Sequence, residues 1–331
     1  MHDFDYYLLT PKHSSLNSRS NVKTDTEITK GLKIFHPIVA SPMNTVCEYQ
    51  MANAMCETGS YGFLHRYMPI MQQVSFATLI GKPAVSIGVN GDSKERFDTL
   101  YNKADIKMVT IDVAHGDTDS CLDMVKYIKH EYGDNVKVIS GNIVTIDAAH
   151  RYENVDVDCF RVGIGAGSAC TTRIITGVGY NQLRAIKEIK TAFPDVPIIN
   201  DGGIRNSGDL AKVLAAGASS SFVGSLLSPA VESCAERVMK DGEKYVVYAG
   251  MASEYAEKRR VGRTGEKAES IDHIIAPEGE IRLIPDKGEK AEAIINRLVQ
   301  GLKHSMAYLG AETIPEMWQK ASWTNAGYEP L

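Results

Sequence analysis

The sequence predicts an α/β protein of the (β/α)8 TIM-barrel class, and two observations carry this prediction. First, eight short apolar, β-branched runs recur at steps of roughly 20–40 residues, with amphipathic segments between them. Second, the first run ends in Ser41-Pro42-Met43-Asn44. That segment is not the glycine-rich turn that opens a doubly wound, dinucleotide-binding sheet. The doubly wound sheet therefore remains only as the alternative fold.

The predicted elements alternate along most of the chain. The strands are Pro37–Ala40, Tyr61–Leu64, Ala84–Gly88, Met108–Val113, Val136–Ser140, Cys159–Gly163, Pro197–Asn200 and Ser220–Gly224. Amphipathic helices are expected at Leu122–Tyr132, Asn181–Phe193, Ser207–Ala215 and Ala291–Leu309.

Two segments fall outside the alternation, residues 1–35 and 226–290. The first is a polar N-terminal extension. The second contains a charged, glycine-punctuated stretch from Lys258 to Lys267, which predicts a mobile loop over the barrel mouth. We expect a single domain, 1–331, with a flap at about 252–280. The short interval from Arg66 to Pro83 leaves no room for an inserted regulatory domain.

Composition narrows the function classes. The 331 residues carry a net charge of −5, so no basic field exists to hold nucleic acid. No apolar run approaches the ~20 residues of a membrane span, and Met1–Tyr7 lacks the features of a signal peptide. The six cysteines form no CxxC pair, which favours reduced thiols. These features together predict a cytoplasmic protein.

The most informative motif runs from Gly163 to Arg173, after the sixth strand. Its sequence is Gly-Ile-Gly-Ala-Gly-Ser-Ala-Cys-Thr-Thr-Arg. Glycines at every second position permit unusual dihedral angles and close ligand approach. Cys170 on such a loop is accessible, and neighbouring amides favour its thiolate, so it is a candidate nucleophile. Thr172 is placed to pass a proton. An ordinary loop cysteine is the alternative; the other five cysteines are expected to be buried and inert.

Further polar groups follow other strands, whose carboxyl ends converge in a barrel. Asp201-Gly202-Gly203 and Gly224-Ser225 follow strands seven and eight, where barrels commonly hold phosphate; Asp201 itself suits ribose hydroxyls. Asp112, at the end of strand four, suits a cofactor amide or ribose. Glu278, at the end of the flap, suits a general acid or base.

Together these segments resemble the IMP dehydrogenase and GMP reductase family, from about Phe4 to about Gly310. The resemblance is carried by Val162–Gly179, Ser41-Pro42-Met43, Asp201-Gly202-Gly203, Gly224-Ser225-Leu226, Tyr248-Ala249-Gly250-Met251 and Glu278-Gly279.

The resemblance implies an oxidoreductase in which Cys170 adds to C2 of a purine nucleoside monophosphate and a nicotinamide cofactor exchanges hydride. Thr172 and Glu278 match the proton relay of the reductase. The positions that match substrate binding are Ser168, Asp201, Gly202, Gly203, Gly224, Ser225, Tyr248, Gly250, Met251 and Gly279. The cofactor positions are Asp112, Ala114 and Asn142, and carbonyls of Gly165, Gly167 and Cys170 match a potassium site. Homotetramers are the family's usual assembly.

Within the family, the reductase is favoured. Ser18-Arg19-Ser20-Asn21-Val22 resembles the reductase N-terminus, and no Arg-Tyr pair, which activates water in the dehydrogenase flap, occurs between Gly250 and Glu278. Against this, that interval is nearer in length to the dehydrogenase flap, and Ile275 replaces an arginine usual in reductases. Ala166 and Asn44 also depart from the residues usual in the family, a proline and an aspartate.

We therefore expect reduction of GMP to IMP and ammonia with NADPH. Oxidation of IMP to XMP with NAD is the alternative. A barrel that binds purine nucleotides without catalysis is a further possibility.

Overall fold

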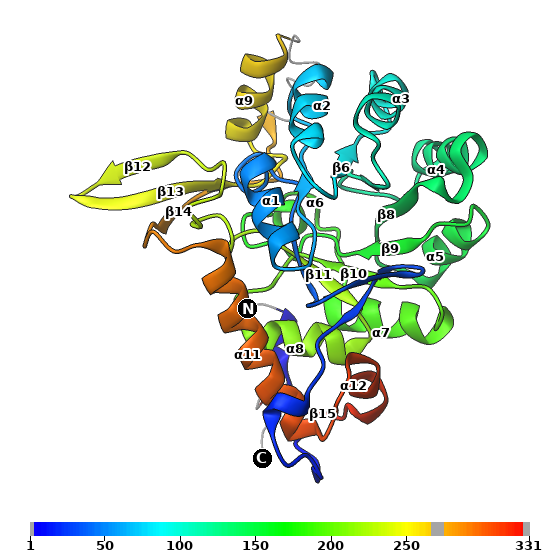
Figure 1. The fold of residues 1–331 in the computed structure, drawn as a ribbon, viewed down its shortest axis with the longest axis vertical. Coiled ribbons are helices and arrows are strands. Elements are labelled where there is room, and N and C mark those ends of the chain that lie inside the picture. Colours follow the sequence, from blue (N-terminus) through cyan, green and yellow to red (C-terminus); the bar gives the residue numbers. More distant parts are fainter. Residues whose placement is uncertain (1–2, 266–274, 327–331) are drawn as a thin grey trace.

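A closed barrel of eight parallel strands forms the centre of the chain in the computed structural model, which describes residues 3–265 and 275–326. Its strands run in the order β4-β11-β10-β9-β8-β7-β6-β5 (Figure 1). The two ends of this sheet meet where Ala40 bridges Gly62, which closes the barrel. The strands are β4 (Ile38–Ala40), β5 (Phe63–Leu64), β6 (Ala84–Ile87), β7 (Met108–Ile111), β8 (Lys137–Ile143), β9 (Cys159–Val162), β10 (Ile198–Asp201) and β11 (Ser220–Val223).

Helices cover the outside of this barrel. They are α1 (Tyr49–Glu57), α2 (Ile70–Thr78), α3 (Ser93–Ala104), α4 (Asp119–Tyr132), α5 (Ile146–Glu153), α7 (Gln182–Ala192), α8 (Ser207–Ala216), α11 (Ala291–Leu309) and α12 (Ile314–Lys320). The short helix α6 (Thr172–Thr176) lies instead in the loop after β9 and has no buried residue. Several begin at a side-chain cap of the kind that satisfies the first free amides. Thr118, Thr145 and Asn206 each accept a backbone N–H at the start of α4, α5 and α8.

Alternation along the strands separates two cores. On β9, Phe160 and Val162 face the helices, whereas Cys159 belongs to the barrel interior. The interior is filled by large side chains such as Phe63 and Phe222, whose rings lie 5.3 Å apart. A hairpin of β2 (Thr26–Thr29) and β3 (Leu32–Ile34) adds Ile28 and Ile34 to the same interior cluster. The interior is thus packed, and a ligand can enter only at the carboxyl ends of the strands.

The predicted architecture is confirmed. Each of the eight predicted strands overlaps an observed one, and the helix predicted at Ala291–Leu309 has the observed limits of α11. Among the strands, the largest boundary difference is in β8, which continues to Ile143 rather than ending at Ser140. None of the helices in the described residues is long and apolar enough to cross a bilayer.

The segment after β11 contains secondary structure that was not predicted from the sequence. The chain there forms an antiparallel sheet of β12 (Arg237–Lys240), β13 (Glu243–Ala249) and β14 (Ile281–Pro285), whose β12–β13 hairpin projects from the barrel (Figure 1). The charged stretch that suggested a loop is largely helix α9 (Glu254–Thr264).

The charges of α9 have helical spacing. Lys258 pairs with Glu254, and Arg260 with Glu257, across one turn, and Ser253 caps the helix by accepting the Ala256 N–H. Gly265 ends the helix in the left-handed conformation. Residues 266–274 of the expected flap lie outside the described residues, whereas residues 275–280 are described.

Candidate functional site

The cysteine loop after β9 is held by one arginine. Arg173 donates through Nε to the Ile164 carbonyl at 3.2 Å and through Nη2 to the Tyr180 carbonyl at 2.6 Å. Its Nη1 donates to Asp3 of the N-terminal extension at 2.9 Å. Gly165 has φ +73°, and a Cβ there would meet Arg173 Cγ at 2.5 Å. A glycine is therefore required for the loop to pass this close to the arginine.

The three predicted catalytic side chains form one hydrogen-bonded chain. The Cys170 thiol donates to Thr172 Oγ1 at 3.2 Å, and the Thr172 hydroxyl donates to Glu278 Oε2 at 2.8 Å. All three are partly buried. The sequence analysis predicted that these three residues act in the same reaction, and the structure places them in contact.

Backbone pairing places Glu278 there. The Thr171 N–H donates to the Glu278 carbonyl at 2.9 Å, and the Glu280 N–H donates to the Ala169 carbonyl at 2.9 Å. Between them, Cys170 and Gly279 form an antiparallel bridge. The cysteine loop and the end of the flap thus fix one another, and the carboxylate does not depend on its side-chain contacts alone.

A cavity of about 380 Å³ opens beside this chain. Its lining includes Cys170, Thr172 and Glu278, the predicted cofactor residues Asp112, Ala114 and Asn142, and the loop glycines Gly165 and Gly167. A smaller cavity of about 130 Å³ shares Cys170, Asp201, Gly202, Gly250 and Met251 with it, and adds Ser168, Gly203, Gly224, Ser225 and Tyr248. Gly279 lines neither, but bridges Cys170. The predicted site residues therefore gather at one mouth.

The smaller cavity has the residues expected to hold phosphate. Gly224 lies against Tyr248, so a Cβ at Gly224 would meet the Tyr248 hydroxyl at 2.8 Å. Burial raises the pKa of Tyr248 to about 12, so its hydroxyl keeps its proton at neutral pH and remains a donor. Tyr248, Ser168, Ser225 and the glycine amides can all donate to an anion.

Sequence reasoning missed Arg161, a buried cation at the floor of the larger cavity. Its guanidinium binds Asp112 through Nη1 at 2.7 Å and Asp201 through Nε at 2.9 Å. Burial disfavours its charge, but the two carboxylates outweigh burial and raise the pKa of Arg161. The available signal was a charged residue in a fully buried strand, at an inward position two residues after Cys159.

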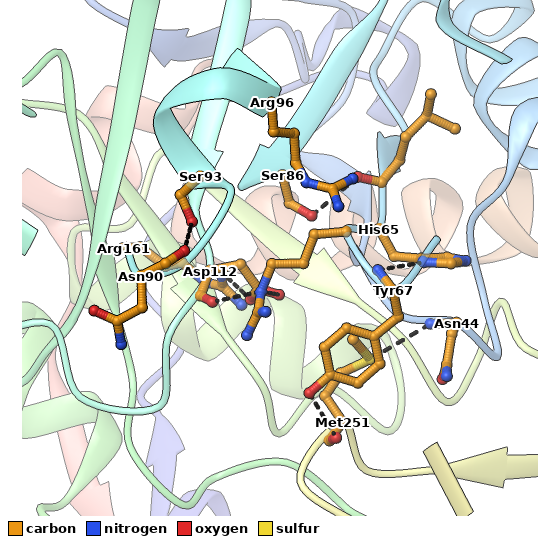
Figure 2. A network of polar contacts seen from close by, with 12 residues as sticks. Asn44, His65, Tyr67, Ser86, Asn90, Ser93, Arg96, Asp112, Arg161 and Met251 are labelled. Atoms are coloured by element: carbon orange, nitrogen blue, oxygen red, sulfur yellow. Dashed lines mark hydrogen bonds and ion pairs between the residues drawn. The ribbon is translucent and has the colours of Figure 1, made fainter. Parts of the chain in front are cut away.

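The contacts of Arg161 and its neighbours determine which oxygen atoms of Asp112 and Asn142 can still accept a hydrogen bond from a ligand. Asp112 Oδ1 accepts from Arg161 Nη1 (Figure 2). Its other carboxylate oxygen, Oδ2, lies 3.8 Å from Arg66 Nε, so the carboxylate is ion-paired on both sides and is not a free acceptor. Asn142 donates through Nδ2 to Asp201 and to the Gly163 carbonyl, both at 2.6 Å. Its Oδ1 is buried without a partner among the described residues. Asn142 lines the larger cavity, although its unpaired Oδ1 is itself shielded from solvent.

Known proteins match the chain over almost its whole length. The IMP dehydrogenase / GMP reductase domain matches residues 1–329. The chain belongs to this family. An inosine-5′-monophosphate dehydrogenase of Borreliella burgdorferi is 34% identical, covering 99% of this chain and 94% of that protein. GMP reductase 2 of Bos taurus is 32% identical, covering 97% and 93%.

A solved structure supports the fold of this family member. The crystal structure of a GMP reductase variant from Trypanosoma brucei, in complex with guanosine 5′-monophosphate, superimposes with a TM-score of 0.91. The match covers 98% of this chain and 95% of that one at 24% sequence identity. The family assignment establishes an oxidoreductase of purine nucleotides, and relatives of both activities are about equally similar.

Helix α9 of this family member is anchored over the mouth at three points. The Tyr67 hydroxyl donates to the Met251 carbonyl at 3.2 Å, just before the helix (Figure 2). Asn44 Nδ2 donates to the Ala256 carbonyl at 3.3 Å, and Arg263 pairs with Glu48 at 2.6 Å. Asn44 thus contributes a donor that holds α9.

One group of side chains in the described residues has the composition of a metal site: Glu48, His65 and Cys234. Both ring nitrogens of His65 are engaged, because Nε2 contacts Glu48 Oε1 at 3.1 Å and Nδ1 accepts the Tyr67 N–H at 3.1 Å. The same Glu48 oxygen accepts from Arg263. The group is therefore an ion-paired support for α9 and a poor metal ligand set.

The predicted potassium ligands lie on the cysteine loop. The Gly167 carbonyl accepts the Cys170 N–H at 3.0 Å, which leaves it one lone pair. Backbone carbonyl oxygens suit a hard cation. The three residues fit such an ion chemically, but they supply only part of a coordination shell.

The remaining cysteines are unsuited to nucleophilic chemistry. Burial raises the pKa of Cys47, Cys56, Cys121, Cys159 and Cys234, for Cys234 to about 12. All six cysteines of the chain are free thiols. Cys170 is the one that lies in contact with a proton-carrying side chain in the larger cavity.

Proposed function

We propose that this chain is a GMP reductase, which converts GMP and NADPH into IMP, ammonia and NADP⁺. The observation that carries the proposal is the chain of hydrogen bonds from Cys170 through Thr172 to Glu278 at the wall of the larger cavity. A carboxylate and a hydroxyl next to a thiol can remove the thiol proton and return it to a leaving amine.

In this proposal Cys170 Sγ bonds to C2 of GMP while its proton moves to Thr172 and Glu278. The C2–N2 bond then breaks, and the relay protonates the departing amino group, which leaves as ammonia. A nicotinamide cofactor, held at Asp112, Ala114 and Asn142, would supply the hydride that C2 receives. The C2–S bond breaks last, its electron pair returns to sulfur, and IMP is released. The sum consumes GMP, NADPH and two protons, and yields IMP, NADP⁺ and ammonium.

The surrounding residues are assigned by their position. Ser168, Gly203, Gly224, Ser225 and Tyr248 of the smaller cavity would hold the phosphate. Asp201 would accept from ribose hydroxyls, and Gly202, Gly250, Met251 and Gly279 would lie against the nucleoside. Asp112, Ala114 and Asn142, which line the larger cavity, would face the cofactor. Carbonyls of Gly165, Gly167 and Cys170 would contribute to a potassium site.

IMP dehydrogenase is the second candidate, because relatives with that name are as similar. That reaction must activate a water molecule. An Arg-Tyr pair does line the larger cavity, Arg66 and Tyr67, although it comes from the loop after β5 and not from the flap. Burial raises the pKa of Tyr67, and its hydroxyl proton is committed to the Met251 carbonyl. Tyr67 is therefore a poor base, which supports the reductase.

Cofactor absorbance separates these functions directly. The purified protein is incubated with GMP and NADPH, and separately with IMP and NAD. The reductase oxidises NADPH only when GMP is present. Reduction of NAD in the presence of IMP alone would assign the dehydrogenase. Nucleotide binding with no turnover of either pair would indicate a barrel without catalysis.

A further inference from the structure

Arg161 occupies a position that is costly for a charge. It is 6% exposed, on a strand whose other residues are fully buried. Its guanidinium lies 5.0 Å from the centre of the Phe222 ring, in the barrel interior. A buried cation is tolerated only when its hydrogen bonds are satisfied. The groups that accept hydrogen bonds from Arg161 therefore indicate its role in the site.

Those groups are two carboxylates that line different parts of the site. Nη1 binds Asp112 Oδ1 at 2.7 Å (Figure 2). On the other side, Nε and Nη2 bind Asp201 Oδ2 at 2.9 and 2.8 Å. Asp112 belongs to the larger cavity, whereas Asp201 lines both cavities. One planar guanidinium therefore spans the two sides, which a lysine ammonium cannot do.

The hydrogen bonds on Asp201 are unevenly distributed. Oδ2 accepts three N–H groups, two from Arg161 and one from Asn142 Nδ2 at 2.6 Å. No described residue donates to Oδ1. The carboxylate is thus fixed in rotation through one oxygen while the other remains available to a ligand.

We infer that Arg161 is a positioning residue that presents Asp201 Oδ1 to a ribose hydroxyl of the bound nucleotide, and that the Asp112 contact keeps the guanidinium in place. The inference rests on the proposed function, because it requires a purine ribonucleotide at this site. Arg161 acts through Asp201 and need not contact the nucleotide. Its loss should therefore alter discrimination between ribose and deoxyribose, and not only overall affinity.

The test is equilibrium binding of GMP, 2′-deoxy-GMP and 3′-deoxy-GMP to the full-length protein. The unmodified protein should bind GMP about tenfold more tightly than at least one deoxy analogue, because a buried acceptor then loses its partner. In Arg161→Lys that ratio should fall to within about twofold, because an ammonium keeps the charge but not the planar fork.

A matched variant separates the two residues that hold Oδ2. Asn142→Ala removes one donor and leaves the ion pairs of Arg161 intact, so it should keep most of the discrimination. It also keeps the inference testable if Arg161→Lys does not fold, as checked by thermal unfolding. Loss of discrimination in Asn142→Ala would assign the role to Asn142 and overturn the inference. Equal weakening of all three nucleotides by Arg161→Lys would show a structural role and overturn it too.

The same binding measurements distinguish failure of the proposed function from failure of the inference about Arg161. If the unmodified protein bound none of the three nucleotides, the site would not be a purine ribonucleotide site, and both conclusions would fall. If it bound GMP with tenfold preference and Arg161→Lys kept that preference, the inference alone would fall.

Discussion

The hydroxyl of Thr172 donates to the carboxylate of Glu278 at 2.8 Å across 106 positions of sequence. This contact joins the loop after β9 to the end of the segment that follows β13, and each of these two parts of the chain carries part of the proposed proton relay. It depends on the pairing of Cys170 with Gly279, which aligns the two backbones. A change in the backbone of either segment should therefore disrupt the contact between Thr172 and Glu278.

Replacing Cys170 by Ala should reduce turnover to background while nucleotide binding changes by less than about threefold, because most of the proposed binding residues lie on other loops. Steady-state assays and equilibrium binding measure the two effects. Cys56→Ala is the matched control, since Cys56 is also partly exposed but lines neither cavity. A Cys170→Ala protein with near-normal turnover would exclude a covalent mechanism.

Replacing Glu278 by Gln should lower kcat for GMP by about 100-fold or more, because an amide cannot carry the relay proton. The dissociation constant of GMP should change by less than about threefold, since the backbone of residue 278 still pairs with Thr171. Thr172→Val should behave similarly, because it breaks the same chain. Loss of GMP affinity in parallel with kcat would make Glu278 a binding residue instead.

Gly165→Ala should lower stability by about 2 kcal/mol or more, because it combines positive φ with a clash against Arg173. Gly177→Ala is the control: Gly177 has nearly the same φ, +71° against +73°, but open space around it, so about 1 kcal/mol is expected. Urea unfolding measures both. Gly165→Ala should also reduce activity, because the loop must leave Arg173. Equal costs for the two variants would refute the close contact.

His36 should make stability depend on pH. Burial lowers its pKa from the ordinary 6.5 to about 4, so in acid the unfolded chain binds a proton that the folded chain does not. Above pH 6.5 His36 is neutral in both the folded and the unfolded chain, so its burial costs no stability there. As the pH falls from 6.5 to 4, up to about 3 kcal/mol of the free energy of unfolding is lost. In His36→Gln this part of the loss should disappear. Urea unfolding across that range measures the difference; parallel curves for both proteins would contradict the pKa.

The barrel could be predicted from the sequence, because strands that are buried on both faces consist of short apolar runs that recur along the chain. It also predicted Cys170, Thr172 and Glu278 together, although only the resemblance related them. It failed at α9, whose charges look like a solvated loop until their pairing across one helical turn is seen. Arg161 was missed because its partners, Asp112 and Asp201, are 49 and 40 positions away and are brought close only by barrel closure.

The central claim is tested most directly by measuring the products of GMP and NADPH with the purified protein. IMP, ammonia and NADP⁺ are quantified by chromatography and an ammonia assay, in parallel with an incubation of IMP and NAD. The account predicts the three products in equal amounts, and little or no XMP in the parallel incubation. Steady formation of XMP from IMP and NAD, with no oxidation of NADPH by GMP, would contradict it and identify a dehydrogenase.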